Sequence, residues 1–209
     1  MQEKRSGYFS KNGCTCVSLE RWHYYNGSSH LHGDIPLTNS SKLIYQGRIL
    51  KLVIDSLTLP NGKAVELEIL QHPGGAAIVA LDEKNRICLL RQYRHAAGGW
   101  IWELPAGKLE PGEAPQTTAA RELTEEAGLH AGHWSSLGKF FVSPGFCDEI
   151  IYLYIARDLT VVPAQPEEDE LFETHWLPFE QALEQVHDGT IVDAKTMLGL
   201  TLAAKHIPV

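Results

Sequence analysis

Three glutamates, Glu122, Glu125 and Glu126, have the residue type and spacing to bind a metal ion. Spacings of three and four residues in a helix would place Glu122 and Glu126 on one face, with Glu125 beside them. A solvated helix usually offsets such acids with Lys or Arg four positions further on, but here only Arg121 is spaced to pair with Glu125. A hard divalent cation such as Mg²⁺ stabilises crowded carboxylates. The helix alone leaves two interpretations open, a metal site and a solvated acidic face.

The residues around these glutamates form a longer pattern, over residues 107–129. The segment GKLEPGEAPQTTAARELTEEAGL places a glycine, a glutamate, an Arg-Glu pair, a Glu-Glu pair and a final glycine at the spacing of a Nudix box, with aliphatic residues at both required positions. The chain therefore resembles the Nudix hydrolase family. The resemblance implies an α/β fold, the Nudix α/β/α sandwich with a mixed β-sheet. It also implies hydrolysis of a nucleoside diphosphate derivative, with Mg²⁺ or Mn²⁺ as cofactor.

The resemblance further implies roles for individual residues of the box. Glu122 and Glu126 would be the principal metal ligands, and Glu125 and the Ala106 carbonyl would lie alongside them. Gly107 would let the backbone approach the metals. Glu113 would support the loop, and Arg121 would orient a box carboxylate.

The reaction needs a proton acceptor in addition to metal. Metal ions neutralise phosphoryl oxygens and lower the pKa of a bound water, which attacks phosphorus once a carboxylate takes its proton. Because the box glutamates are committed to metal, this base is expected in the acidic run 165–170. Resemblance to the ADP-ribose pyrophosphatase branch assigns Glu168 as the base and Glu170 as a further metal ligand, whereas a loop kept polar for solubility is the alternative. The next choices for the base are Glu167 and then Glu125 or Glu149.

Several segments outside the box resemble the same branch. They are LLRQYR (89–94), WELPAGKLE (102–110), SPGFCDE (143–149) and the tail GTIVDAKTMLGL (189–200). This resemblance implies that ADP-ribose is cleaved to AMP and ribose 5-phosphate. The residues that it implies as substrate contacts are Arg94, Glu149, Pro144 and Tyr45.

Other interpretations of these features stay open. Leu67 and Arg48 stand where relatives often carry an arginine and an aromatic residue, so GDP-mannose or another nucleotide sugar is the alternative substrate. A nucleotide sensor without turnover is the rival class, although such a protein is expected to have lost box glutamates. Pro144-Gly145 could be an ordinary turn, and Arg94 could form a surface ion pair. Trp100 and Trp102 could simply pack in the core.

Periodicity and turn residues predict the elements that position these side chains. Asn61-Gly62 supplies the positive φ angles of a hairpin turn, and two runs around residues 82–85 predict a further strand pair. Pro115 and Gly128 bound the long helix. The predicted strands are 43–56, 65–70, 76–81, 86–93, 137–142, 150–156 and 175–177, and the predicted helices are 115–127 and two within 178–204.

Composition divides the chain into an extension and a globular part. Residues 1–41 are rich in Gly, Ser and Asn and show no periodicity, which predicts an extension. The family resemblance implies that strands within 42–72 exchange across a homodimer and that 73–209 form the Nudix hydrolase domain.

Charge and hydropathy argue against other classes of protein. The chain has 209 residues and a formal net charge of −8 without any basic run, so binding to nucleic-acid phosphates is not expected. No apolar stretch approaches the roughly 20 residues that span a bilayer, and no signal-peptide pattern is found near residue 1. The sequence therefore predicts a cytoplasmic enzyme that acts on a small molecule, with no membrane partner.

Overall fold

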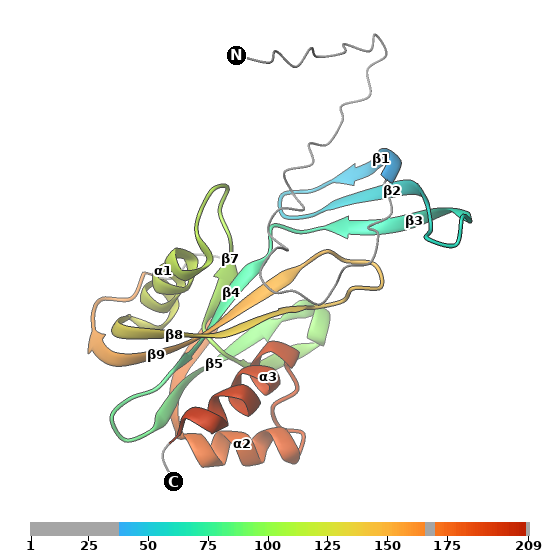
Figure 1. Ribbon diagram of the computed structural model, residues 1–209. Coiled ribbons are helices and arrows are strands. Elements are labelled where there is room, and N and C mark those ends of the chain that lie inside the picture. Colours follow the sequence, from blue (N-terminus) through green and yellow to red (C-terminus); the bar gives the residue numbers. More distant parts are fainter. Residues whose placement is uncertain (1–37, 166–169, 208–209) are drawn as a thin grey trace, which may run out of the picture. The chain divides into compact units, whose positions relative to one another are not determined.

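The computed structural model describes residues 38–165 and 170–207, which contain three β-sheets and three α-helices (Figure 1). Most of the predicted extension lies outside the described residues, and so do the candidate base Glu168 and its neighbour Glu167. No helix in the two described stretches is long and apolar enough to cross a bilayer.

The N-terminal sheet is antiparallel, in the order β1-β2-β3. The predicted run 43–56 is two strands rather than one, because the chain turns where the Gly47 N–H donates to the Leu50 carbonyl at 2.9 Å. The hairpin predicted at Asn61-Gly62 is confirmed, with Gly62 at a φ of 80°. The strands are β1 (Thr38–Gln46), which begins inside the predicted extension, β2 (Lys51–Thr58) and β3 (Ala64–Gln71).

The central sheet is mixed, as predicted, and has the order β7-β4-β9-β8. Strand β4 runs parallel to β9 and antiparallel to β7, and β9 runs antiparallel to β8. Every residue of β4 is buried. The bounds are β4 (Gly75–Ala80), β7 (Ala106–Lys108), β8 (Leu129–Phe141) and β9 (Ile150–Val161).

The third sheet, β10-β5-β6, is antiparallel and corrects one prediction. The two runs around residues 82–85 are both strands, but β4 and β5 belong to different sheets and meet only at a bridge between Leu81 and Ile87. The reason is that both edges of β4 are already paired, with β7 and β9. The bounds are β5 (Arg86–Arg94), β6 (Gly99–Glu103) and β10 (Phe172–Pro178).

The predicted helices are confirmed. Helix α1 (Pro115–Ala127) begins at the predicted proline and ends at Gly128, whose φ of 63° and ψ of 42° are left-handed. The two helices predicted in the tail are α2 (Phe179–His187) and α3 (Ala194–Ala203). Two short 3₁₀ turns, η2 (His95–Ala97) and η3 (Ala204–His206), complete the described helical elements.

Alternating side chains of β4 build two cores, one on each face of the central sheet. Ala76, Ile78 and Ala80 pack in a cluster with Ala119 and Leu123 of α1. Residues on the other face, Ala77 and Val79 among them, pack in a cluster that also holds residues of α2 and α3. The period of two along a strand explains this division. The predicted α/β/α sandwich is therefore confirmed. Helix α1, which carries the box glutamates, covers one face of the central sheet.

Candidate active site

Helix α1 turns two box glutamates toward the protein interior. Glu126 is 2% exposed and Glu122 is 8% exposed, and they share the buried face of α1 with Leu123. Glu125 is only half-buried. The predicted pairing of Glu122 and Glu126 on one helix face is therefore what the structure contains.

Glu126 lies against the backbone of β7. Its Oε2 atom accepts a hydrogen bond from the Ala106 N–H at 2.7 Å. Burial raises the pKa of Glu126 well above its usual range; the bond from Ala106 opposes this rise, and the negative charges of Glu122 and Glu170 add to it. No side-chain cation in the described stretches is hydrogen-bonded to this carboxylate. The charge of Arg94 also opposes the rise, but burial prevails, so the chain compensates the charge of Glu126 only in part.

Glu122 lies against Gly107, the first residue of the box. A Cβ atom at Gly107 would come within 1.9 Å of Glu122 Oε1, so any larger residue there would displace the carboxylate. Burial raises the pKa of Glu122 to about 7, and the charges of Glu125 and Glu170 add to the rise, whereas Arg121 opposes it. The absence of a side chain at Gly107 thus leaves room for the Glu122 carboxylate against the backbone.

Arg121 joins three of the box carboxylates. Its Nη1 donates to Glu122 at 2.7 Å and to Glu125 at 2.9 Å, which includes the pair predicted from spacing. Its Nε and Nη2 donate to Glu113, each at 3.2 Å. The bonds from Arg121, assisted by the Thr118 hydroxyl, lower the pKa of Glu113 to about 2. Glu113 is therefore an anion that holds Arg121, and Arg121 in turn holds Glu122.

Strand β10 brings Glu170 to the same region. The Tyr93 N–H donates to the Leu171 carbonyl at 2.9 Å, which continues the β10–β5 pairing up to the residue after Glu170. The charge of Glu170 contributes to the raised pKa of both Glu122 and Glu126. Glu170, predicted as a ligand on resemblance, thus acts electrostatically on both principal box glutamates.

Arg94 makes an ion pair with a residue that the sequence did not single out. Its Nε and Nη2 donate to the two oxygens of Glu103 at 2.7 and 2.9 Å, and its side chain is 43% exposed. Besides Glu103, the charges of Glu126 and Glu170 act on Arg94 and raise its pKa. Arg94 thus binds the Glu103 carboxylate and also interacts through its charge with Glu126 and Glu170.

The other three predicted substrate contacts belong to different elements from the box glutamates. Pro144 is in a turn closed by Phe146 and Cys147 N–H groups on the Ser143 carbonyl. Glu149 Oε1 lies 3.4 Å from His72 Nδ1. Tyr45 is 59% exposed on β1. Within the described residues, no recorded contact joins these three residues to Glu122 or Glu126.

The donor set fits a hard divalent cation. Among the residues that the structure describes, no three His, Cys, Asp or Glu side chains converge as a metal centre by themselves. Mg²⁺ usually takes only one or two carboxylates, and waters and substrate phosphate complete its shell. Two buried carboxylates beside the glycine-lined backbone meet that requirement: Glu122, which is paired with Arg121, and Glu126, which has a backbone N–H as its hydrogen-bond donor.

Three polar residues near this site were missed by the sequence reasoning. Glu103 and Gln92 are each 2% exposed, and within the described residues Gln92 Oε1 has no hydrogen-bond partner. Lys195 donates to Glu103 Oε2 from the start of α3. The available signal was an acid, Glu103, inside the apolar run of residues 100–104.

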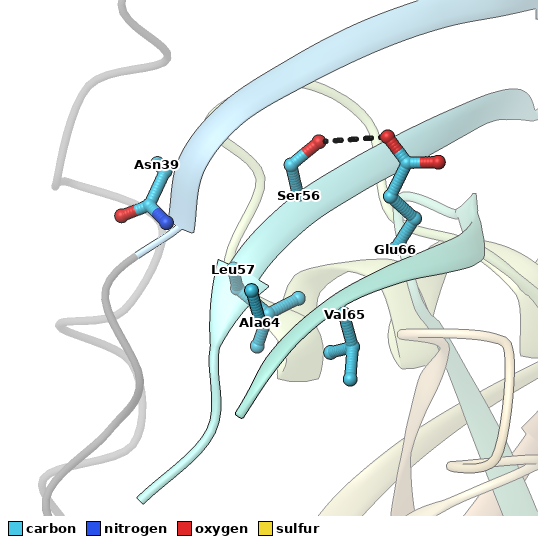
Figure 2. Close-up of a pocket in the computed structure, with 6 residues that line it drawn as sticks. All are labelled: Asn39, Ser56, Leu57, Ala64, Val65 and Glu66. Carbon is cyan, nitrogen blue, oxygen red and sulfur yellow. Dashed lines mark hydrogen bonds between the residues drawn. The ribbon is translucent and has the colours of Figure 1, made fainter. Parts of the chain in front are cut away.

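A separate hollow lies on the N-terminal sheet (Figure 2). It encloses about 290 Å³ and is open to solvent, and the Ser56 hydroxyl donates to Glu66 at 3.4 Å on its wall. None of its lining residues belongs to the box or to the ion pairs around it. These residues are Asn39, Ser56, Leu57, Ala64, Val65 and Glu66. The hollow therefore does not compete with the box as the active site.

Comparison with known proteins gives a family match. A family model described as NUDIX domain matches residues 71–198. A solved structure described as an ADP compounds hydrolase superposes with a TM-score of 0.71 at 20% identity, over 82% of this chain and 93% of that chain. This likeness supports the fold.

Curated relatives match most of the chain. The methanol dehydrogenase activator of Bacillus methanolicus is 41% identical, over 78% of this chain and 89% of the relative. The ADP-ribose pyrophosphatase of Bacillus subtilis (strain 168) is 40% identical, over 76% of this chain and 87% of the relative. A GDP-mannose pyrophosphatase from Enterobacter sp. (strain 638) is 32% identical, over 72% and 84%, respectively.

Proposed function

This chain belongs to the Nudix hydrolase family, and we propose that it cleaves the pyrophosphate bond of ADP-ribose to give AMP and ribose 5-phosphate, with Mg²⁺ as its cofactor and Mn²⁺ as a substitute. The observation that carries the proposal is the pair of buried box glutamates, Glu122 and Glu126, beside the backbone of Ala106 and Gly107. Arg121 pairs with Glu122, but the buried Glu126 receives only a backbone N–H, so a bound cation would stabilise its charge, and a pyrophosphate needs the same cation to approach these carboxylates.

The proposed metal ligands are the Glu122 and Glu126 carboxylates, the Ala106 carbonyl and Glu170. When bound, the metal neutralises phosphoryl oxygens and makes water more acidic. Arg121 holds the Glu122 carboxylate in place, and Glu113 holds Arg121. The Ala106 N–H fixes the orientation of Glu126.

The proposed base is Glu168; the next choice is Glu167, and Glu125 or Glu149 follows. Glu168→Gln is expected to lower kcat by about 10²–10⁴-fold with little change in KM, the usual range for loss of a general base. Glu170→Gln should instead raise the Mg²⁺ concentration needed for half-maximal rate. If single Gln variants at Glu167, Glu168 and Glu170 all keep near-normal kcat at saturating Mg²⁺, the base is Glu125 or Glu149.

The proposed substrate contacts are Arg94, Glu149, Pro144 and Tyr45. Arg94 is supported by its ion pair with Glu103 and by its electrostatic interaction with Glu126 and Glu170. The relative named as a GDP-mannose pyrophosphatase supports the second candidate substrate, GDP-mannose or another nucleotide sugar.

A substrate panel tests the reaction. The protein is incubated with Mg²⁺ and with ADP-ribose, GDP-mannose or other nucleoside diphosphate sugars, and the products are identified by mass. AMP and ribose 5-phosphate are expected from ADP-ribose, and EDTA should abolish their formation. Release of ADP or inorganic phosphate would contradict the proposed bond, and tight binding without turnover would favour the sensor.

We also propose a cytoplasmic homodimer that exchanges its N-terminal strands. The exposed apolar residues Leu43 (53%), Ile44 (46%) and Leu67 (42%) of that sheet support a second copy as its partner. Light scattering should give twice the 23.2 kDa chain mass. A stable, active monomer would contradict the exchange.

A further inference from the structure

The tail motif of residues 189–200 has no role in the reaction as proposed so far. Its centre, from Asp193 to Thr196, forms the start of α3. Asp193 Oδ2 caps the helix by accepting from the Thr196 N–H at 3.0 Å and from its hydroxyl at 2.6 Å. These bonds hold the first turn of α3 rigidly, so its side chains have defined directions.

Lys195 extends from this turn to a buried carboxylate. Its Nζ donates to Glu103 Oε2 and lies 3.1 Å from Asp193 Oδ2, while its side chain is only 16% exposed. Glu103 is 2% exposed and also receives both Arg94 bonds. A carboxylate this deeply buried requires paired cations, since an isolated charge in the interior is strongly disfavoured. Two cations, one from β5 and one from α3, meet that requirement.

The next residue of α3 fixes the backbone between β6 and β7. The Thr196 hydroxyl accepts a hydrogen bond from the Leu104 N–H at 2.8 Å. Leu104 follows Glu103 and precedes the segment whose Ala106 N–H binds Glu126. The start of α3 therefore contacts both the Glu103 ion pair and the chain that leads to the box.

Arg94 interacts with two sets of charges. Two of its nitrogens, Nε and Nη2, are directed at Glu103. The charges of Glu126 and Glu170 also act on Arg94, so the box region lies within electrostatic range of the guanidinium. A guanidinium fixed by one carboxylate can present its remaining N–H groups to a phosphate, because its donors are coplanar and rigid.

We propose that Lys195 is a positioning residue, which holds Glu103 so that Glu103 orients Arg94 toward the phosphates of a nucleoside diphosphate substrate. This inference rests on the proposed pyrophosphate hydrolysis. Lys195 does so in two ways. It fixes the second Glu103 oxygen in space, and it supplies a second positive charge, so that Arg94 is not the sole neutralising partner of Glu103.

Steady-state kinetics with Mg²⁺ and ADP-ribose test the proposal on the full chain. Lys195→Met should lower kcat/KM by about 10²-fold, the size of effect expected from a misplaced binding group. Lys195→Arg should stay within about threefold of the wild type, because a guanidinium can also donate to Glu103 and Asp193. Lys205→Met, at an exposed lysine of η3, is the matched control and should leave the rate unchanged.

A double-mutant cycle separates positioning from general stability. If Lys195 acts through Arg94, adding Lys195→Met to Arg94→Ala should cause no further loss of kcat/KM. Equal fold-losses in both backgrounds would overturn the proposal, and so would a wild-type rate in Lys195→Met. If Lys195→Met does not fold, Lys195→Gln takes its place in the cycle, because it keeps a donor without the charge.

An NMR measurement distinguishes this proposal from the proposed function. The Arg94 Nε–H should exchange with solvent at least about tenfold faster in the Lys195→Met protein, because its carboxylate partner is no longer fixed. Unchanged exchange would overturn the positioning role. Failure of the wild type to hydrolyse any substrate in the panel would overturn the proposed function, while the exchange result would still decide whether Lys195 orders Arg94.

Discussion

Glu103 and Glu126 are equally buried glutamates in opposite surroundings, each 2% exposed. Glu103 receives hydrogen bonds from Arg94 and Lys195, whereas Glu126 receives a backbone N–H from Ala106. For Glu103, burial raises the pKa, but the two cations outweigh it and the pKa is lowered. For Glu126, burial prevails and the pKa is raised well above its usual range.

The chain itself neutralises the charge of Glu103, whereas we expect a bound ligand to neutralise the charge of Glu126. A buried acid with two cationic partners needs no further ligand in the folded protein, and removal of its charge lowers the free energy of unfolding. A buried acid with a single backbone donor is destabilising unless a cation joins it. We therefore expect opposite responses when each glutamate is replaced by its uncharged isostere.

The largest effect is expected at Glu126. Glu126→Gln should lower kcat by at least about 10³-fold, since metal charge stabilisation is worth several kcal/mol. Its melting temperature in EDTA should be unchanged or slightly raised, because a buried acid whose charged form is disfavoured has been replaced by a neutral amide. Steady-state rates and thermal melting measure the two quantities. A fully active variant, or one that melts far below the wild type, would contradict the assignment of Glu126 as a metal ligand.

Glu103→Gln, unlike Glu126→Gln, should lower the stability of the metal-free protein. It leaves Arg94 and Lys195 without a counter-charge, so the free energy of unfolding in EDTA should fall by about 3–5 kcal/mol. Urea denaturation measures this loss. Glu184→Gln, at an exposed glutamate of α2, serves as the matched control and should change stability by less than about 0.5 kcal/mol. Equal stability of the Glu103 variant and wild type would contradict the assigned difference.

The smallest effect concerns pH and Glu122. Its pKa rises from 4.5 to about 7 on folding, so the folded state favours the protonated acid. This contribution to the stability of the metal-free protein is complete below pH 4.5 and is lost as the pH rises through about 7. Measured in EDTA, wild type should therefore lose melting temperature relative to Glu122→Gln across this range, by a few degrees at most. A constant difference at all pH values would refute the assignment.

Local patterns predicted α1 and its carboxylates well. Pro115 and Gly128 act within a residue or two of the helix ends, and the spacing of Glu122 and Glu126 is itself the geometry of one helix face. The Glu103 network could not be predicted in this way. Its partners lie 9 and 92 residues away along the chain, so only the tertiary fold brings them together.

Sheet pairing shows the same limit. Turn residues correctly predicted the β2–β3 hairpin, whose strands are neighbours in sequence. The similar signal between β4 and β5 was misleading, because β9 and β7 occupy the edges of β4. Short strands such as β7 (Ala106–Lys108) carry too few residues for a period to be visible.

The parallel pairing of β4 with β9 has a consequence for synthesis of the chain. Gly75 pairs with Ile151, so β4 is complete long before its partner has been made. At roughly 5–20 residues per second, β4 waits on the order of 4–15 s for β9 to be synthesised. During that interval the apolar segment from Gly75 to Ala80, fully buried in the finished protein, has no central-sheet partner on that edge. Until β9 emerges, this apolar segment and its unpaired edge are therefore prone to association with other chains.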